Sequence, residues 1–426
     1  MCSVACKRTW IVFALTALLL AGCGQEAPPT PVEDLEPVTL RLGIPYQFPG
    51  DDPLLDEVIE RFQQENPHIT VEIVSEYYFD NNTIADSQAD VFVSFPDRTL
   101  VGGEQPAVLS LEPFLSEMVE FDEGDFFPGL LDAFRWQGDL YGLPAYLGMS
   151  VMYYNRDMFD AQGVAYPQAG WTWQDFLGSA QQLTTITEGD GERTGHWGFV
   201  SHPAFGDLIP FILQHGGAIY DDPLAPTRPA CDDPLTAEAI QWYADLGLVH
   251  GVMPIVQQDK VDELSRFPTD AFALQQAAMV MGGIGARGGD IIPWNFDWGV
   301  APLPRDRTGG SWMALRGYFV AARTDHPRQA WALVRSLAES ESSLLPARRS
   351  MAESETFRQR VGTELVDAAL YTLDNDDLLP PFIGLRSYGW YTHFTAQAYW
   401  VVIGDDTAEE MMAKLRGQCE TWSFVE

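Results

Sequence analysis

Aromatic and charged side chains follow two of the strands that the sequence predicts. Tyr46 comes directly after the first strand, and Phe95, Asp97 and Arg98 follow the third. Small molecules that bind α/β proteins sit at the carboxyl ends of the strands. An aromatic ring can cover the apolar face of a sugar, while a few polar groups fix its orientation. These residues suit the binding of a polar solute, although Asp97 and Arg98 would equally suit an exposed salt bridge in a turn.

One glycine-rich segment matches a nucleotide-binding pattern without the structure that such binding needs. Residues 283–288 read Gly-Ile-Gly-Ala-Arg-Gly. A dinucleotide site requires a helix directly after the glycines, whereas Gly289 and Pro293 interrupt this segment. We expect Gly283 to form a turn at which a ligand approaches the backbone. The sequence shows no motif for a metal site or for a nucleophile with its base, so we expect no cofactor and no enzymatic activity.

The amino-terminal segment carries a different chemistry, that of export and lipid attachment. Lys7 and Arg8 precede an apolar run over residues 10–21 that is too short to span a bilayer. Such a run, followed by small residues, is typical of a secretion signal. The sequence Leu-Ala-Gly-Cys over residues 20–23 resembles the lipobox of bacterial lipoproteins, which implies cleavage before Cys23 and acylation of its thiol. The alternative is an ordinary signal peptide that happens to end near a cysteine.

These signals predict where the chain works. Residues 1–22 would be a lipoprotein signal peptide, and residues 23–37, which are rich in proline and acidic residues, would be a tether. Acyl chains on Cys23 would then anchor the protein to a bacterial membrane. We expect an extracytoplasmic protein, in the periplasm or at the cell surface.

Charge, length and cysteine content limit what the exported chain can be. Its 61 acidic and 25 basic residues give a net charge of −36, which argues against nucleic acid as a partner because phosphate contacts need cations. Its 426 residues exceed the roughly 250–300 residues that one hydrophobic core serves, so we expect two lobes. Cys231 and Cys419 would form a disulfide in an oxidising compartment, unless both stay unpaired and buried.

The elements that must position the candidate residues alternate between strands and helices. Residues 38–44 alternate in polarity as a strand does, and Asp52 with Pro53 marks the start of a helix. Strands over residues 69–74 and 90–95 follow, an order that is typical of a parallel sheet covered by helices. Further expected elements are a short buried strand over residues 277–281 and helices that begin near Thr172, Pro234 and Pro327.

A series of short motifs runs in a fixed order through the body of the chain. They are Leu140-Tyr-Gly-Leu-Pro144, Met152-Tyr-Tyr-Asn-Arg-Asp-Met-Phe159, Gly163, Trp171-Thr-Trp-Gln-Asp-Phe176, Leu183-Thr184, Gly216-Gly-Ala218, Ala277-Ala-Met-Val-Met281, Trp298-Gly-Val-Ala-Pro-Leu-Pro304, and Gln329-Ala-Trp-Ala-Leu-Val334 with Glu339-Ser-Glu341. In this order they resemble the extracellular solute-binding proteins, family 1, of ABC importers for carbohydrates. The resemblance runs from about residue 38 to the carboxyl terminus.

The resemblance implies an α/β fold of the periplasmic-binding-protein-like type II. This fold is a two-lobed clamp, in which each lobe is a mostly parallel sheet flanked by helices. The chain would cross between the lobes more than once, and the lobes would close on a solute by a hinge motion. The implied boundaries are residues 38–146 with 304–340 for the first lobe and residues 147–303 with 341–426 for the second.

The resemblance also implies further contacts to the solute. Gly148 stands where the maltose-type relatives carry an acid, and Gly285 stands where they carry a tryptophan, which implies a ligand other than maltose. The implied contacts, in addition to Asp97 and Arg98, are Tyr146, His202, Phe205, Trp312, Arg316, Tyr318, Arg386, Trp390 and Tyr391.

The family to which the chain is similar implies a function without chemical turnover. The protein would be the substrate-binding component of an ABC importer, a monomer that captures a sugar or oligosaccharide and delivers it to two permease subunits with an ATPase. Alternatives are a binding protein of the same fold for a polyol, a glycerophosphodiester or a peptide, a ligand-sensing subunit, and a secreted glycoside hydrolase with paired carboxylates. A local pocket of Arg98, Arg316 and Arg386 would suit a phosphorylated ligand.

Overall fold

The computed structural model describes most of the chain from Glu36 onward. Met1–Glu36 is a unit distinct from Pro37–Glu426, and the predicted signal peptide and almost all of the predicted tether lie outside the described residues. No helix in the described part of the chain is both long enough and apolar enough to cross a membrane. The described residues are 36–44, 53–75, 84, 86–96, 99, 107–118, 121–189, 192–201, 206–221, 227–255, 268–289, 292–311, 313–340, 344–375, 385–419 and 421–422.

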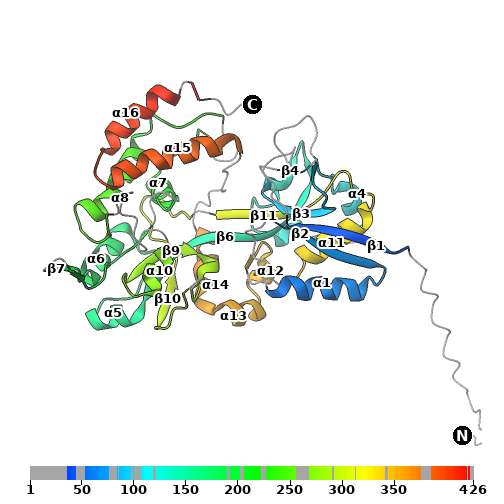
Figure 1. Cartoon of the computed structure of the whole chain (residues 1–426), viewed down its shortest axis with the longest axis horizontal. Helices are drawn as coiled ribbons and strands as arrows, with labels where there is room; N and C mark the ends of the chain where they lie inside the picture. Colours follow the sequence, from blue (N-terminus) through cyan, green and yellow to red (C-terminus); the bar gives the residue numbers. More distant parts are fainter. Residues whose placement is uncertain are drawn as a thin grey trace, which may run out of the picture. The chain divides into compact units, whose positions relative to one another are not determined.

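One mixed sheet connects strands from distant parts of the sequence (Figure 1). Its order is β10-β6-β11-β3-β1-β2, and β9 and β12 also pair with β6. The pairs of β1 with β2 and β3 are parallel, as the strand–helix–strand order predicts, whereas the pairs made by β6 and β11 are antiparallel. The strands are β1 (Val38–Ile44), β2 (Ile69–Ser75), β3 (Val91–Ser94), β6 (Gly142–Asn155), β9 (Met279–Gly283), β10 (Trp298–Ala301), β11 (Met313–Val320) and β12 (Leu345–Pro346).

Two hydrophobic cores form around this sheet, which confirms the two-lobed α/β architecture expected from the sequence. The first core joins β1, β3 and β11 to apolar faces of α1, α11, α13 and α14, and the second is built largely from α5 to α8, α15 and α16. The longer helices are α1 (Pro53–Glu65), α5 (Arg156–Gln162), α6 (Trp173–Leu183), α7 (Ile209–Gln214), α8 (Pro234–Leu248), α10 (Pro268–Ala273), α11 (Pro327–Ala338), α13 (Glu355–Val361), α14 (Thr363–Asn375), α15 (Leu385–Val402) and α16 (Ala408–Cys419). Shorter elements are α4 (Glu112–Leu115), α12 (Arg349–Ala352), the 3-10 turns η1 (Glu123–Asp125), η2 (Asp132–Phe134) and η5 (Ile284–Ala286), and the hairpin strands β4 (Arg135–Trp136), β5 (Asp139–Leu140), β7 (Thr187–Gly189) and β8 (Glu192–Thr194).

Strand β6 belongs to both cores. Its first half pairs with β11, and its second half pairs with β9 and β10. Because successive side chains of a strand point to opposite faces, Val151 and Tyr153 pack in the first core while Met152 and Tyr154 pack in the second. Figure 1 shows β6 and β11 running between the two groups of elements.

Local signals in the sequence fix where several helices begin. The expected helix start at Thr172 is confirmed, because Thr172 and Asp175 exchange hydrogen bonds in a capping box at the start of α6. Asn155 caps α5, since its side chain accepts a hydrogen bond from the amide of Met158. Helix α8 begins at Pro234 as expected and continues through Gly247 to Leu248. Gly247 faces the segment after the helix, where a Cβ would lie 3.1 Å from Ile255.

A disulfide joins Cys231 to Cys419 across 188 residues of sequence, with their Cα atoms 6.4 Å apart. Cys231 is buried in the second core and precedes α8, and Cys419 ends α16. The bond therefore ties α16 to the segment that precedes α8 in the second core.

Candidate binding site

Four side chains from separate segments form a row across neighbouring strands. Arg316 of β11 lies opposite Tyr146 of β6, and Tyr146 also lies opposite Pro346 of β12. On the other side of β11, the guanidinium carbon of Arg316 lies 4.6 Å from the centre of the Phe95 ring. Phe95, Arg316, Tyr146 and Pro346 are called the cross-strand row below. Three of these four residues were expected from the sequence, where 221 positions separate Phe95 from Arg316.

The alternation of β11 explains why Arg316 is available at this sheet face. Leu315 and Phe319 are buried in the first core, whereas Arg316 and Tyr318 are only half-buried. The pairing register shifts between Arg316 and Gly317, so the strand is irregular where the arginine projects. A β-bulge of this kind redirects side chains and is frequent beside binding sites.

The turn after β9 lies farther along the same strand. Gly283 is exposed and opposes Ser150 of β6, four residues beyond Tyr146, a separation of roughly 13 Å along an extended strand. The hydroxyl of Ser311 donates to the carbonyl of Ser150 at 2.8 Å and accepts from the amide of Ser150 at 3.1 Å. A Cβ on Gly283 would have no heavy atom nearer than the carbonyl oxygen of Met149, at 4.0 Å. The structure therefore leaves open space over this turn.

Several expected contact residues lie outside the described residues. The aromatic residues among them, apart from Phe205, are Tyr46 and Trp312. Asp97, Arg98, His202 and Phe205 also lie outside the described residues. So do the predicted lipidation site Cys23 and the side chain of Arg386.

The structure places two expected contact residues of α15 against the second core. Trp390 is fully buried, and its indole nitrogen donates to the carbonyl oxygen of Ile219 at 3.1 Å. Its ring also packs edge-on against Trp422. Tyr391 is 8% exposed and packs against the backbone of Gly206. Trp390 therefore presents no open face to a solute in this structure, and it is not brought together with the cross-strand row.

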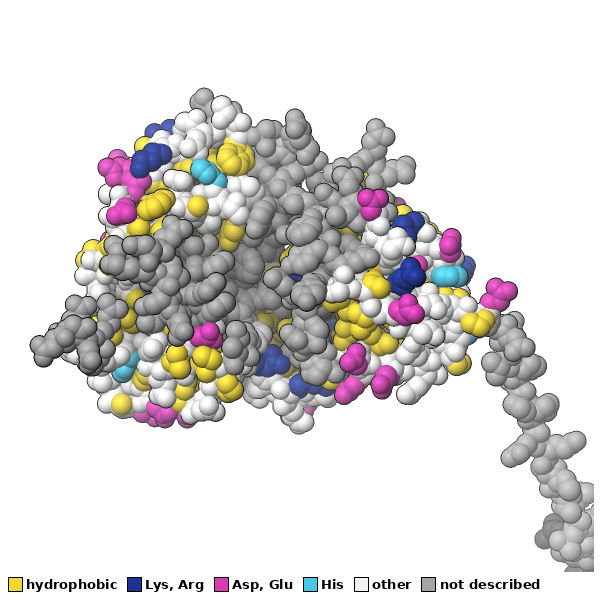
Figure 2. Space-filling view, in the orientation of Figure 1, with side chains coloured by type: hydrophobic (Ala, Val, Ile, Leu, Met, Phe, Trp, Pro, Cys, Tyr) yellow, Lys and Arg dark blue, Asp and Glu magenta, His cyan; other side chains and the backbone are white. Residues whose placement is uncertain are grey.

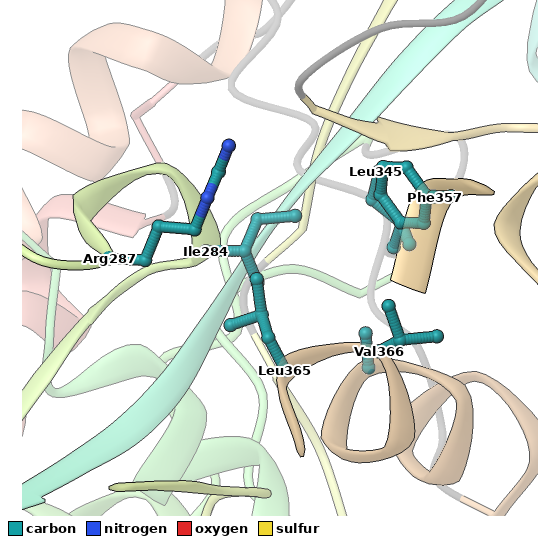
Figure 3. Close-up of a pocket in the computed structure, with 7 residues that line it drawn as sticks. Ile284, Arg287, Leu345, Phe357, Leu365 and Val366 are labelled. Carbon is teal, nitrogen blue, oxygen red and sulfur yellow. The ribbon is translucent and has the colours of Figure 1, made fainter. Parts of the chain in front are cut away.

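A small hollow lies among η5, β12, α13 and α14 (Figure 3). Seven residues line it, and its volume of about 10 Å³ is close to the space of one water molecule. Leu345, which opposes Leu147 beside Tyr146, contributes one wall. The hollow is too small for a sugar ring. Its lining residues are Ile284, Arg287, Leu345, Phe357, Leu365, Val366 and Ala369.

The charges around β6 are largely neutralised in pairs. Arg156, directly after β6, contacts Asp297 at 2.8 Å and Glu364 of α14 at 2.5 Å. Burial raises the pKa of Tyr154, and nearby Arg156 partly opposes that shift, so this phenol stays protonated at neutral pH. On the face drawn in Figure 2, basic side chains of the described residues stand near acidic ones. The described residues contain no group of three or more His, Cys, Asp or Glu side chains able to hold a metal ion.

The described part of the site can hold a polar ring by stacking and hydrogen bonding. Phe95 supplies aromatic surface and Arg316 a planar cation with several donors, whereas Tyr146 is 8% exposed and packs in the first core. Sequence reasoning missed Pro346, Leu345 and Arg287. The pairing of β12 with β6 has no local signal, and Arg287 could have been noticed only as a cation set between glycines.

Comparison with known proteins identifies a family and a similar relative for this chain. Residues 49–343 match the family described as bacterial extracellular solute-binding protein. The chain is 26% identical over 301 residues to an arabinooligosaccharide-binding protein of Halalkalibacterium halodurans, a match that covers 65% of this chain and 62% of that relative's length.

Solved structures share the fold over most of the chain. An ABC substrate-binding protein from Listeria monocytogenes in complex with cycloalternan is 20% identical, with a TM-score of 0.73 over 91% of this chain and 99% of that one. A glycerophosphocholine complex from Mycobacterium tuberculosis is 16% identical, with a TM-score of 0.69 over 89% of this chain and 97% of that one. Proteins of one fold bind chemically different cargo, so the likeness shows the fold alone.

Proposed function

Because the chain belongs to the bacterial extracellular solute-binding protein family, we propose that it captures a saccharide outside the cytoplasm for an ABC importer. The sugar or oligosaccharide would bind between two hinged lobes, and the closed protein would deliver it to a pair of permease subunits driven by an ATPase. The protein binds its cargo and releases it unchanged. In this proposal residues 38–146 and 304–340 form one lobe, and residues 147–303 and 341–426 form the other.

The cross-strand row is the observation that carries this proposal. It combines the ring of Phe95, the phenol of Tyr146 and the guanidinium of Arg316 on one face of the sheet that connects both cores. Aromatic surface with a few polar groups is the composition that orients a sugar ring. The similarity to an arabinooligosaccharide-binding protein supports a saccharide as the cargo. Tyr46, Asp97, Arg98, His202, Phe205, Trp312 and Arg386 are proposed as further contacts, with Tyr318 and Gly283.

A thermal-shift screen tests the cargo directly. The full chain, solubilised in detergent, is melted with sugars, oligosaccharides, polyols, glycerophosphodiesters and peptides. A ligand that binds only the folded protein stabilises it by about 2.7 kcal/mol at 100 times its dissociation constant. A shift with one saccharide that is then recovered intact supports the proposal. A shift with a phosphodiester or a peptide alone refutes the saccharide assignment, and recovery of a cleaved saccharide refutes binding without turnover.

We also propose that Cys23 is acylated and anchors the protein to the outer side of a bacterial membrane. The basic start, the short apolar run and the small residues before Cys23 support this. Mass spectrometry of the processed chain should find two or more acyl chains on an amino-terminal Cys23. A Cys23→Ser variant should be released from the membrane fraction, and its retention there would contradict the proposal.

A further inference from the structure

Arg287 is a half-buried cation without a partner in the part of the chain that the structure describes. Most described arginines lie within 4.0 Å of a carboxylate, as Arg156, Arg328 and Arg358 do. Arg287 makes no hydrogen bond, ion pair or ring contact with the described residues. The chain has 61 acidic residues, so the missing partner reflects the surroundings of Arg287 and not a shortage of carboxylates.

The local backbone keeps the space around Arg287 open. Arg287 follows the turn η5, which comes directly after β9. Gly283 and Gly285 are both exposed, and Cβ atoms built on them would have no heavy atom nearer than 3.8 Å. Gly288 follows with a positive φ of 75°, which strongly favours glycine there. A larger molecule can therefore approach this turn without displacing side chains.

Arg287 lies close in the chain to one proposed contact of the saccharide site, since it comes four residues after Gly283, directly beyond the turn η5. It lines a hollow with Leu345, whose side chain points to the sheet face opposite that of Pro346. Figure 3 shows the Arg287 guanidinium directed away from Leu365 and Val366, which form the apolar wall. The charged end of Arg287 is thus turned away from the apolar lining of the hollow.

A half-buried guanidinium loses part of its hydration, and this desolvation cost is offset only when an anionic group binds to it. The planar fork of arginine matches a carboxylate through two parallel hydrogen bonds. We propose that Arg287 binds a carboxylate of the cargo, so that the transported solutes are saccharides carrying uronic acid residues. This inference rests on the proposed function, because it specifies which saccharides the same site selects.

Matched pairs of neutral and acidic saccharides test the inference. Calorimetry on the full chain in detergent compares galacto-, gluco- and manno-oligosaccharides with the corresponding uronic acid oligomers of equal length. In at least one pair, the acidic member should bind about tenfold to a hundredfold more tightly. Arg287→Gln should remove most of that difference and leave the affinity for the neutral member unchanged. Arg287→Lys should retain part of it, because lysine keeps the charge but lacks the fork.

Arg305→Gln is the matched control. Arg305 is also half-buried and without a side-chain partner among the described residues, but it lies beside the start of α6 and does not line the hollow. This variant should keep the preference for the acidic saccharide.

The possible results separate this inference from the proposed function. Equal binding of neutral and acidic members, unaffected by Arg287→Gln, would overturn the role of Arg287 and leave the saccharide function standing. Tighter binding of glucose 6-phosphate than of every uronic acid oligomer, lost in Arg287→Gln, would overturn the carboxylate assignment. Absence of binding to any saccharide, with binding to peptides or polyols, would refute the proposed function itself.

Discussion

Replacement of Gly317 by alanine tests whether the sheet positions Arg316 as described. A Cβ at Gly317 would lie 2.6 Å from Cζ of the Phe134 ring and 2.8 Å from the carbonyl oxygen of Leu143. Both distances are well below van der Waals contact, and the Leu143 carbonyl is part of β6. Since ring and strand are both packed in the first core, neither can move freely. Overpacking of this kind destabilises a protein by about 1–3 kcal/mol.

Urea unfolding of Gly317→Ala measures this loss, with Gly178→Ala as the control. Gly178 lies within α6, and a Cβ there would meet no heavy atom within 4 Å. Alanine is preferred to glycine inside a helix by roughly 0.5–1 kcal/mol, so the control should gain stability. The two variants should therefore differ in unfolding free energy by about 1.5–4 kcal/mol.

The same variant should weaken solute binding, because Gly317 adjoins Arg316 at the register shift of β11. A saccharide found by the thermal-shift screen should bind less tightly to Gly317→Ala than to Gly178→Ala. Equal unfolding midpoints for Gly317→Ala and the unaltered protein would refute the crowding argument. Lost stability with unchanged affinity would refute the link between this strand position and the site.

Removing the disulfide with Cys231→Ser and Cys419→Ser should lower the unfolding free energy by about 5 kcal/mol, given the sequence separation of 188 between the cysteines. Urea unfolding should show the same loss when the unaltered protein is reduced, and unchanged midpoints would contradict it. Burial holds the pKa of His196 below its usual 6.5, so the unfolded state binds the proton first and stability falls as the pH drops from about 7 to 5. His196→Gln should flatten that dependence in melts at several pH values, and an unchanged slope would count against it. Arg316→Met should weaken saccharide binding by about 10- to 100-fold, because it removes the guanidinium donors proposed to contact the cargo; calorimetry that finds equal affinities would exclude a contact.

Local chemistry explains what the sequence could predict of the fold. The capping box of Thr172 and Asp175 and the start of α1 at Pro53 depend on neighbours within a few residues. The parallel pairing of β1 with β2 follows from strand–helix–strand order. The antiparallel pairs of β6 could not be predicted in this way, because their partners lie far away in the sequence.

The candidate site also depends on contacts between residues that lie far apart in the sequence. Phe95, Tyr146 and Arg316 could be named one by one, but their meeting depends on the register of three strands. Trp390 had the residue type of a sugar contact, yet its indole nitrogen is bonded to the carbonyl of Ile219 inside the second core. A tryptophan carries the same sequence signal in a core as in a site, so only its tertiary partners distinguish the two.

Strand β6 contributes side chains to both cores, and this limits where lobes can be exchanged between related proteins. Successive residues Val151 to Tyr154 alternate between the two cores, so a break in this strand would remove packing from both at once. A chimera with a relative should therefore not have its junction within β6 (Gly142–Asn155), because such a junction would disturb both cores. Chimeras between relatives should retain their fold only when this strand is inherited whole, together with the β11 residues paired to it.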